Sequence, residues 1–131
     1  MRTSFAVVLA VAVTSMTLPE QSFAQVTVEA EMAAQIVDKM PQDPSTSFAV
    51  DVGVVYCWTR VTGGADTELQ HIWIHDEMEF PVTLEIGGSP WRTWTSKTIP
   101  PEWAGEWRVE VRDGAGVLLD TRSFTVGASD S

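Results

Sequence analysis

From Phe48 onward, apolar and polar residues alternate along short segments that are separated by turns rich in glycine, proline and aspartate. A period of two places successive side chains on opposite faces of a β-strand, and β-branched and aromatic residues are frequent in these segments. The pattern predicts strands over 48–61, 69–75, 80–86, 91–99, 106–112 and 117–126. We expect short turns to pair the first three of these strands.

Residues 25–47 give a weaker signal. Val26-Thr27-Val28 alternates as a strand does, whereas apolar residues from Ala33 to Met40 recur at helical spacing until Pro41. A short helix and a ragged edge strand are both open for this region. The residues that follow, up to Thr46, have the composition of a loop.

Six or seven short strands with turns at this spacing are typical of an all-β, immunoglobulin-like antiparallel β-sandwich. We expect this domain over 48–126, after an N-terminal edge segment and loop over 25–47 and before a disordered tail over 127–131. The single cysteine, Cys57, excludes an intramolecular disulfide. Its place in a strand predicts a buried and unreactive thiol.

The first 24 residues have the features of a secretory signal peptide. Arg2 supplies a positive charge, Phe5–Leu18 is largely apolar, and Ser22-Phe23-Ala24 resembles a cleavage site. The apolar run is too short to favour a membrane span. We therefore expect cleavage after Ala24 and a periplasmic or secreted chain that is not inserted in a membrane.

The chain carries a formal net charge of −10, from 18 acidic and eight basic side chains. Nucleic acids and anionic lipid surfaces attract proteins through many Lys and Arg residues, so this balance argues against both kinds of partner. An acidic surface is typical of a soluble protein and does not identify a ligand.

The segment Pro90–Lys97 gathers indoles, cations and hydroxyls in one extended run. Alternation places Arg92 and Trp94 on one face, and Trp91 and Lys97 on the other. One interpretation is structural, with an arginine stacked on a tryptophan between two sheets.

The other interpretation of this segment is a ligand-binding patch. Indoles stack on sugar rings, cations and hydroxyls bond to sugar hydroxyls, and Trp and Arg also dominate protein interfaces. The candidate ligand-binding residues are Trp73, His75, Trp91, Arg92, Trp94 and Lys97.

His71 and His75 share one face of the strand predicted over 69–75. Side chains four positions apart on a strand stand about 13 Å apart, which is too far for both to bind one metal ion. We therefore expect half-buried histidines that are hydrogen-bonded across the sheet, no metal site and no cofactor.

Acidic residues cluster near His75, namely Asp76, Glu77 and Glu79. Paired carboxylates can act as acid and base, so a small hydrolase that uses His75 with Asp76 or Glu79 is a further alternative. No catalytic motif such as G-x-S-x-G or H-E-x-x-H occurs, and we expect no enzyme activity.

Several motifs carry a family resemblance. They are Val55–Val61, His71–His75, Trp91–Ile99, Gly105–Val109, Asp113-Gly114, Leu118-Leu119 and Phe124. In this order they resemble the bacterial domain-of-unknown-function family 2914 (DUF 2914), and the resemblance runs from Ile36 to Val126. It implies an exported or membrane-linked bacterial protein with an extended segment over 35–41, and it supplies no catalytic residue.

These observations together predict a non-catalytic, exported module that binds or scaffolds in the bacterial cell envelope through a Trp- and Arg-rich face. Its partner is expected to be an envelope protein or a glycan. The alternative functions are a carbohydrate- or peptidoglycan-binding module and a small envelope hydrolase.

Overall fold

A computed structural model of the protein describes residues 26–127. The long strands in this range are β1 (Thr27–Ala33), β5 (Gly53–Thr62), β6 (Thr67–His75), β7 (Met78–Ile86), β8 (Trp91–Ile99), β9 (Gly105–Asp113) and β10 (Leu118–Val126). Three strands have two residues each, β2 (Ile36–Val37), β3 (Met40–Pro41) and β4 (Ser47–Phe48). The described chain contains one 3₁₀ turn, η1 (Pro101–Trp103), and no α-helix, and none of its helical segments is long enough to cross a membrane.

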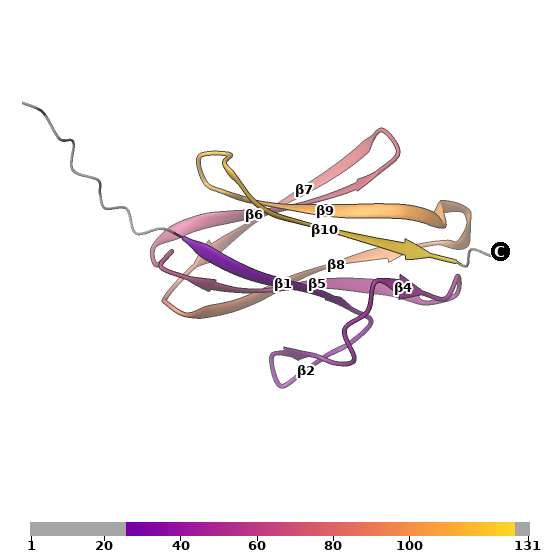
Figure 1. The fold of residues 1–131 in the computed structure, drawn as a ribbon, viewed down its shortest axis with the longest axis horizontal. Helices are drawn as coiled ribbons and strands as arrows, with labels where there is room; N and C mark the ends of the chain where they lie inside the picture. The colour runs from indigo at the N-terminus through magenta and orange to yellow at the C-terminus, as the bar shows by residue number, and fades with distance from the viewer. Residues whose placement is uncertain (1–25, 128–131) are drawn as a thin grey trace, which may run out of the picture.

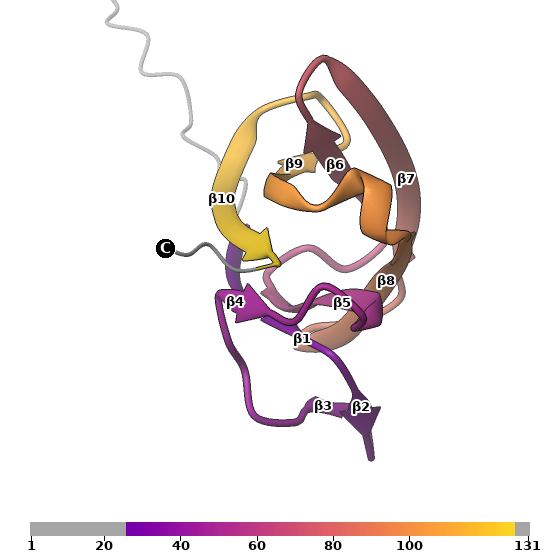
Figure 2. The ribbon, with the colours of Figure 1, turned by 90° about the vertical axis from the view of Figure 1, so that its right-hand side faces the viewer.

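The long strands form two sheets that face each other (Figures 1 and 2). One sheet has three strands in the order β1-β5-β8, and the other has five in the order β4-β10-β9-β6-β7. All pairings are antiparallel except the short one between β4 and β10. The expected all-β architecture with antiparallel sheets is confirmed.

The expected pairing of the first three strands by short turns is correct only in part. β6 pairs with β7, but β5 lies in the other sheet, between β1 and β8. The turn after β5 therefore carries the chain from one sheet to the other. Positive φ angles at Gly63 and Asp66, 83° and 66°, make this crossing compact.

The N-terminal segment is extended, so the helix alternative is wrong. β1 pairs with β5 through seven consecutive residues, and β2 and β3 form a hairpin whose turn has positive φ at Asp38 and Lys39. Of the apolar residues at helical spacing, Ala33 is buried whereas Val37 and Met40 are exposed, so they share no apolar face. The alternative of an edge strand is therefore the correct one for β1, which lies at one edge of the three-stranded sheet.

The core lies between the sheets and follows the alternation of the strands. On β9, Trp107, Val109 and Val111 are buried, as expected. The main cluster of buried residues contains Met32, Phe48, Val55, Cys57, Trp73, Ile99, Trp107, Val109, Phe124 and Val126. A second cluster contains Ala30, Val61, Leu69, Ile86 and Val111.

Two strands form the open edges on one side of the sandwich, β7 in the five-stranded sheet and β8 in the three-stranded sheet (Figure 2). β7 carries Pro81 and the exposed residues Glu79 and Glu85. Proline within a sheet is confined to edges and bulges because it has no N–H to donate. The predicted signal peptide and the last four residues of the predicted tail lie outside the described residues.

Candidate functional site

The outer side of the three-stranded sheet carries two pairs of directly opposite residues. Trp58 and Arg60 lie two positions apart on β5, so their side chains share this side, and Trp94 and Arg92 lie opposite them on β8. We call these four residues the Trp/Arg face. Cross-strand partners of this kind have Cβ atoms about 5 Å apart, so the two indoles and the two guanidinium groups form adjacent rows.

The β2–β3 hairpin covers part of the Trp/Arg face. The Nε1–H of Trp58 donates to the carbonyl oxygen of Lys39 at 2.9 Å, and this contact explains why Trp58 is buried on an outer face. Nη1 of Arg92 lies 3.4 Å from the Sδ of Met40. A hollow of about 280 Å³ remains beside these contacts, lined by Met40, Arg60, Pro90 and Arg92.

The two arginines of the face differ in their surroundings. Arg60 lies 3.8 Å from the carboxylate of Glu29, and both side chains are more than half exposed. Such a pair contributes little to stability because water screens it. Arg92 forms no ion pair with any residue that the structure describes.

The six residues predicted from the sequence do not form one surface. Arg92 and Trp94 lie on the Trp/Arg face, and Trp91 packs over Gly87 and Gly88 with 38% of its surface exposed. Trp73 and His75 lie in the core, with 1% and 7% exposed.

Lys97 lies between the sheets at their open side. Its Nζ is 3.7 Å from the ring centroid of Phe80 and 5.4 Å from that of Trp103. The cation stacked on aromatic rings is therefore a lysine, and among the described residues no arginine takes the expected position over a tryptophan. This contact ties β8 to the facing sheet.

Trp58 and Arg60 complete the face and were not among the predicted residues. The sequence shows them two positions apart in a strand, which is the same signal that selected Arg92 and Trp94. The missing information was the pairing of β5 with β8, because turn sequences alone do not show which strands are neighbours.

His71 is fully buried between the sheets and joins three strands by hydrogen bonds. Its Nδ1 lies 2.7 Å from Oγ1 of Thr95 and its Nε2 lies 3.3 Å from Oγ1 of Thr59. The hydroxyl of Thr59 also donates to the carbonyl oxygen of Thr93, and Nε1–H of Trp73 donates to Oγ1 of Thr95.

These partners define the tautomer of His71. Because the Thr59 hydroxyl gives its proton to a carbonyl oxygen, Thr59 must accept from Nε2–H of His71. Thr95 accepts from Trp73 and donates its own proton to Nδ1. Burial lowers the pKa of His71 from its ordinary value of 6.5 to about 4, so the ring is neutral near pH 7. The histidine expected to be half-buried is thus a buried structural link.

His75 is also held by the core. Its ring stacks on Trp107 with centroids 4.5 Å apart, and Nδ1–H donates to the carbonyl oxygen of Glu106 at 3.0 Å. Nε2 lies 3.7 Å from Oδ2 of Asp76, which is longer than a hydrogen bond. Glu79 is opposite Ile74, on the other side of the sheet from His75. These carboxylates and this imidazole therefore do not converge on one reacting atom.

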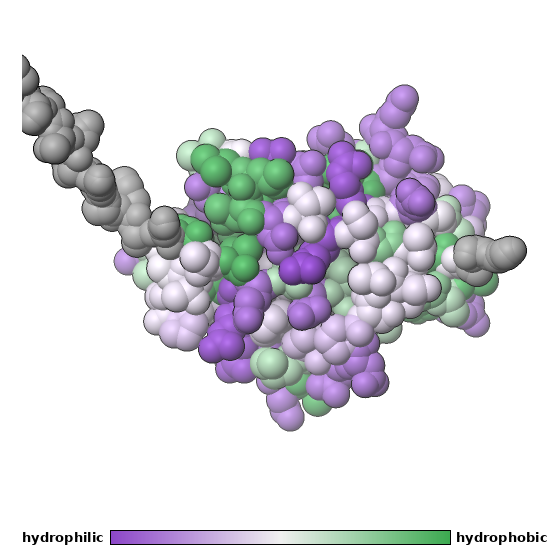
Figure 3. All heavy atoms as spheres, in the orientation of Figure 1, coloured by the Kyte–Doolittle hydropathy of each residue, from purple (hydrophilic) through white to green (hydrophobic). Residues whose placement is uncertain are grey.

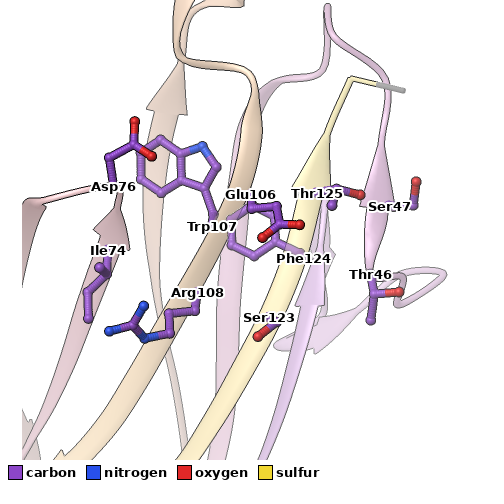
Figure 4. Close-up of a pocket in the computed structure, with 10 residues that line it drawn as sticks. All are labelled: Thr46, Ser47, Ile74, Asp76, Glu106, Trp107, Arg108, Ser123, Phe124 and Thr125. Carbon is purple, nitrogen blue, oxygen red and sulfur yellow. The ribbon is translucent and has the colours of Figure 1, made fainter. Parts of the chain in front are cut away.

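A larger hollow of about 590 Å³ lies on the outer side of the five-stranded sheet (Figure 4). Ile74, Arg108 and Ser123 form a row across β6, β9 and β10, and Glu106 and Thr125 form the next row. The hydroxyl groups of Ser123 and Thr125 and the charged side chains of Glu106 and Arg108 could form hydrogen bonds with a polar ligand in this hollow. The hollow offers no exposed indole platform, because Trp107 is buried.

Hydrophobic residues gather on one end of the surface, where β1 and β10 begin (Figure 3). Val117 and Leu118 are exposed there, and Val26, Val28 and Leu119 pack against the second core cluster.

Cys57 and the acidic residues do not form a reactive centre. Burial raises the pKa of the Cys57 thiol, which opposes formation of the thiolate. Within residues 26–127, no three His, Cys, Asp or Glu side chains are close enough together to hold a metal ion.

Comparison with known proteins finds solved structures of similar fold and a family match over part of the chain. The chain resembles the solved structure of a beta-glucosidase from Listeria innocua in complex with glucose, with 9% sequence identity and a TM-score of 0.46, over 85% of this chain and 17% of that chain. No curated protein matches the sequence. The model of the family described as "Protein of unknown function (DUF2914)" matches residues 66–126, and over this part of the chain it agrees with the family that the sequence motifs indicated.

Proposed function

We propose that this protein is an exported, non-catalytic binding or scaffolding module of the bacterial cell envelope. It has an immunoglobulin-like sandwich and recognises an envelope protein or a glycan through the Trp/Arg face. The strand order supports this fold, because β1, β5 and β8 take the places of strands A, B and E, and β6, β9 and β10 those of C, F and G. The apolar leader with its Ser22-Phe23-Ala24 site supports export.

The observation that carries the proposal is the composition of the Trp/Arg face. The solvated side of an antiparallel sheet is usually polar. Trp58 serves folding on this side, because its indole holds the β2–β3 hairpin, whereas Trp94 donates no such bond to any residue that the structure describes. Here Trp94 is only partly covered, and Arg92 lies beside it on the same strand. Trp and Arg are the residue types that contribute most to binding at protein surfaces.

The non-catalytic part of the proposal is supported by the state of the histidines. His71 has both ring nitrogens occupied by threonine hydroxyls, and His75 is stacked in the core with its Nδ1–H bonded to a carbonyl. The two threonine hydroxyls beside His71 are themselves buried, with 0% of Thr59 and 7% of Thr95 exposed, so a substrate has no access to them.

A carbohydrate- or peptidoglycan-binding function is the alternative favoured by one specific feature. A partly exposed indole next to a guanidinium group offers a stacking platform for a sugar ring and donors for its hydroxyls. Trp94 and Arg92 have this arrangement.

The test is a titration of the exported protein with cell-wall and polysaccharide fragments and with envelope protein fractions, followed by tryptophan emission and by retention on a column. Wild type is compared with Trp94→Ala and with Trp91→Ala, whose exposed indole lies off the face. We expect saturable binding to one ligand class that Trp94→Ala abolishes and Trp91→Ala preserves. Binding that survives both Trp94→Ala and Arg92→Ala in folded protein would place recognition on another surface and refute the proposal.

A further inference from the structure

Two arginines stand directly opposite each other on the exposed side of β5 and β8. Like charges in this position destabilise a sheet, and the chain has only eight basic side chains for its whole surface. Arg108, Arg112 and Arg122 lie against carboxylates of the five-stranded sheet. Arg60 lies 3.8 Å from the carboxylate of Glu29, whereas Arg92 has no carboxylate partner among the described residues. An anion between Arg60 and Arg92 would remove the repulsion between them.

The hollow beside these arginines is slightly smaller than an ordinary ligand pocket. Its volume is about 280 Å³, and its walls are Arg60, Arg92, Met40 and Pro90. Pockets for whole drug-sized ligands start near about 300 Å³, so this hollow suits one acidic substituent with part of the ring that carries it. Guanidinium groups bind carboxylates with two parallel hydrogen bonds, a geometry that lysine does not offer.

Within residues 26–127, the side chains around these arginines do not saturate their donors. The distance of 3.8 Å between Nη1 of Arg60 and Oε1 of Glu29 exceeds a hydrogen bond, and the Glu29 side chain is 68% exposed. Arg92 has a thioether, Met40, as its recorded side-chain partner, and sulfur is a weak acceptor. An incoming carboxylate therefore finds free N–H groups on both arginines.

Trp94 places an aromatic platform next to this site. It lies two positions from Arg92 on the same face, about 7 Å along the strand. A sugar ring stacked on the indole thus reaches the guanidinium groups with an acidic substituent, whereas an acidic peptide would gain little from the indole.

We infer that the Trp/Arg face binds an acidic polysaccharide, with a sugar ring on Trp94 and its carboxylate between Arg60 and Arg92. This inference rests on the proposed function and names the ligand class of the same face. The net charge of −10 restricts the ligand further, because a densely charged polymer would be repelled by the rest of the surface. A glycan with isolated carboxylates, separated by neutral sugars, satisfies both conditions.

The experiment is calorimetric titration of the exported protein with a short hyaluronan-type oligosaccharide, which has a carboxylate on every second ring. The carboxyl-reduced form of the same oligosaccharide is the neutral control. We expect the acidic form to bind about 10- to 100-fold more tightly, as charge-assisted hydrogen bonds would provide. Arg92→Gln removes this preference, whereas Arg122→Gln, which removes the same charge from the other sheet, preserves it.

Other outcomes separate this inference from the proposed function. Equal affinity for both oligosaccharides, lost in Trp94→Ala, overturns the acidic-ligand inference and leaves the binding module intact. Arg92-dependent binding of an oligo-glutamate peptide, with no binding of either sugar, assigns the face to an acidic protein segment and also overturns it. If Trp94→Ala and Arg92→Gln change no binding at all, both proposals fail.

Discussion

At the scale of single residues, His71 links the two sheets through an ordered series of hydrogen bonds. Trp73 donates to Thr95, Thr95 donates to His71, and His71 donates to Thr59, which donates to the backbone. In this series each hydroxyl and ring N–H donates to the next group, and every donor has an acceptor. The series therefore needs a neutral His71 ring with its proton on Nε2. A protonated His71 ring would carry N–H groups on both nitrogens. The Nδ1–H group would then face the hydroxyl proton of Thr95, which donates to Nδ1 in the neutral state and would lose its acceptor.

The pKa of His71 predicts how stability depends on pH. The folded-state pKa of about 4 lies below the ordinary value of 6.5, so the unfolded chain takes up the proton first as the pH falls. The stabilisation is complete above about pH 6.5, is lost progressively below it, and is gone below about pH 4. Between about pH 7 and pH 5 this group should lower the free energy of unfolding by about 2 kcal/mol.

Urea denaturation of wild type and of His71→Asn, measured at both pH values, isolates this contribution. Asn does not titrate, so the other ionisable groups cancel in the difference between the two proteins. An identical pH dependence in both would show that His71 is already protonated or solvated in the folded state.

Trp107 is a large buried side chain of the main core cluster and contacts several of its aromatic residues. Its ring stacks with His75 and Phe124, and its Nε1–H donates to the carbonyl oxygen of Trp103 at 2.9 Å. We expect Trp107→Ala to lower the free energy of unfolding by about 3 to 5 kcal/mol. Trp91→Ala, which removes a partly exposed indole, is the control in the same denaturation experiment; a similar loss in both variants would contradict the packing described here.

At the scale of elements, alternation located the last five of the six strands expected after residue 48 to within two residues of their ends. The strand expected over 48–61 is wrong at its start, because residues 49–52 form a turn between β4 and β5, which lie in different sheets. Alternation did not show that the chain changes sheet after β5, because the turn Gly63–Asp66 has the composition of an ordinary hairpin turn. The β2–β3 hairpin was also hidden, since its turn uses Asp38 and Lys39 at positive φ in place of glycine or asparagine. Local patterns thus define strands, whereas partners depend on contacts that are distant in the sequence.

The hairpin is anchored to the three-stranded sheet by the indole of Trp58. Trp58→Phe removes the hydrogen bond to Lys39 but keeps an aromatic ring, so we expect a loss of about 1 kcal/mol in the free energy of unfolding. Hydrogen exchange should also become faster at the amide of Gln42, which bonds to the carbonyl oxygen of Gln35 within the hairpin. Trp94→Phe, with no such bond, is the control; unchanged exchange in Trp58→Phe would mean that other contacts hold the hairpin.

At the scale of the whole molecule, the sequence predicted one strand of the candidate site and misplaced the rest. Arg92 and Trp94 were found because they share a face of one strand. Trp73 and His75 were predicted as part of the same patch, yet they lie in the other sheet and both point into the core. The buried face of a strand is the one that faces the other sheet. A single sequence does not show which face this is when both faces of the strand carry aromatic residues.

Export also belongs to this scale, since it concerns the chain before it folds. We expect signal peptidase to cleave after Ala24, so the intact mass of protein recovered from the periplasm or medium should correspond to residues 25–131. Ala24→Lys, which places a large charged residue at the cleavage site, should leave the leader attached. A wild-type mass that retains residues 1–24 would contradict the predicted localisation.

Lys97 also affects how copies of this protein behave when they are crowded. An unpaired strand edge can template the growth of fibrils, and natural sheets oppose this with inward-pointing charges and with proline. β8 has the inward-pointing ammonium of Lys97 at its edge, and β7 has Pro81 between glutamates at the edge beside it. A strand added beside β8 would have to desolvate the ammonium group of Lys97. A strand added beside β7 would have a carbonyl oxygen without a hydrogen-bond donor, because Pro81 has no N–H. Both of these open edges are therefore poor templates for amyloid, so the protein should stay monomeric at concentrations at which sheets with unprotected edges aggregate.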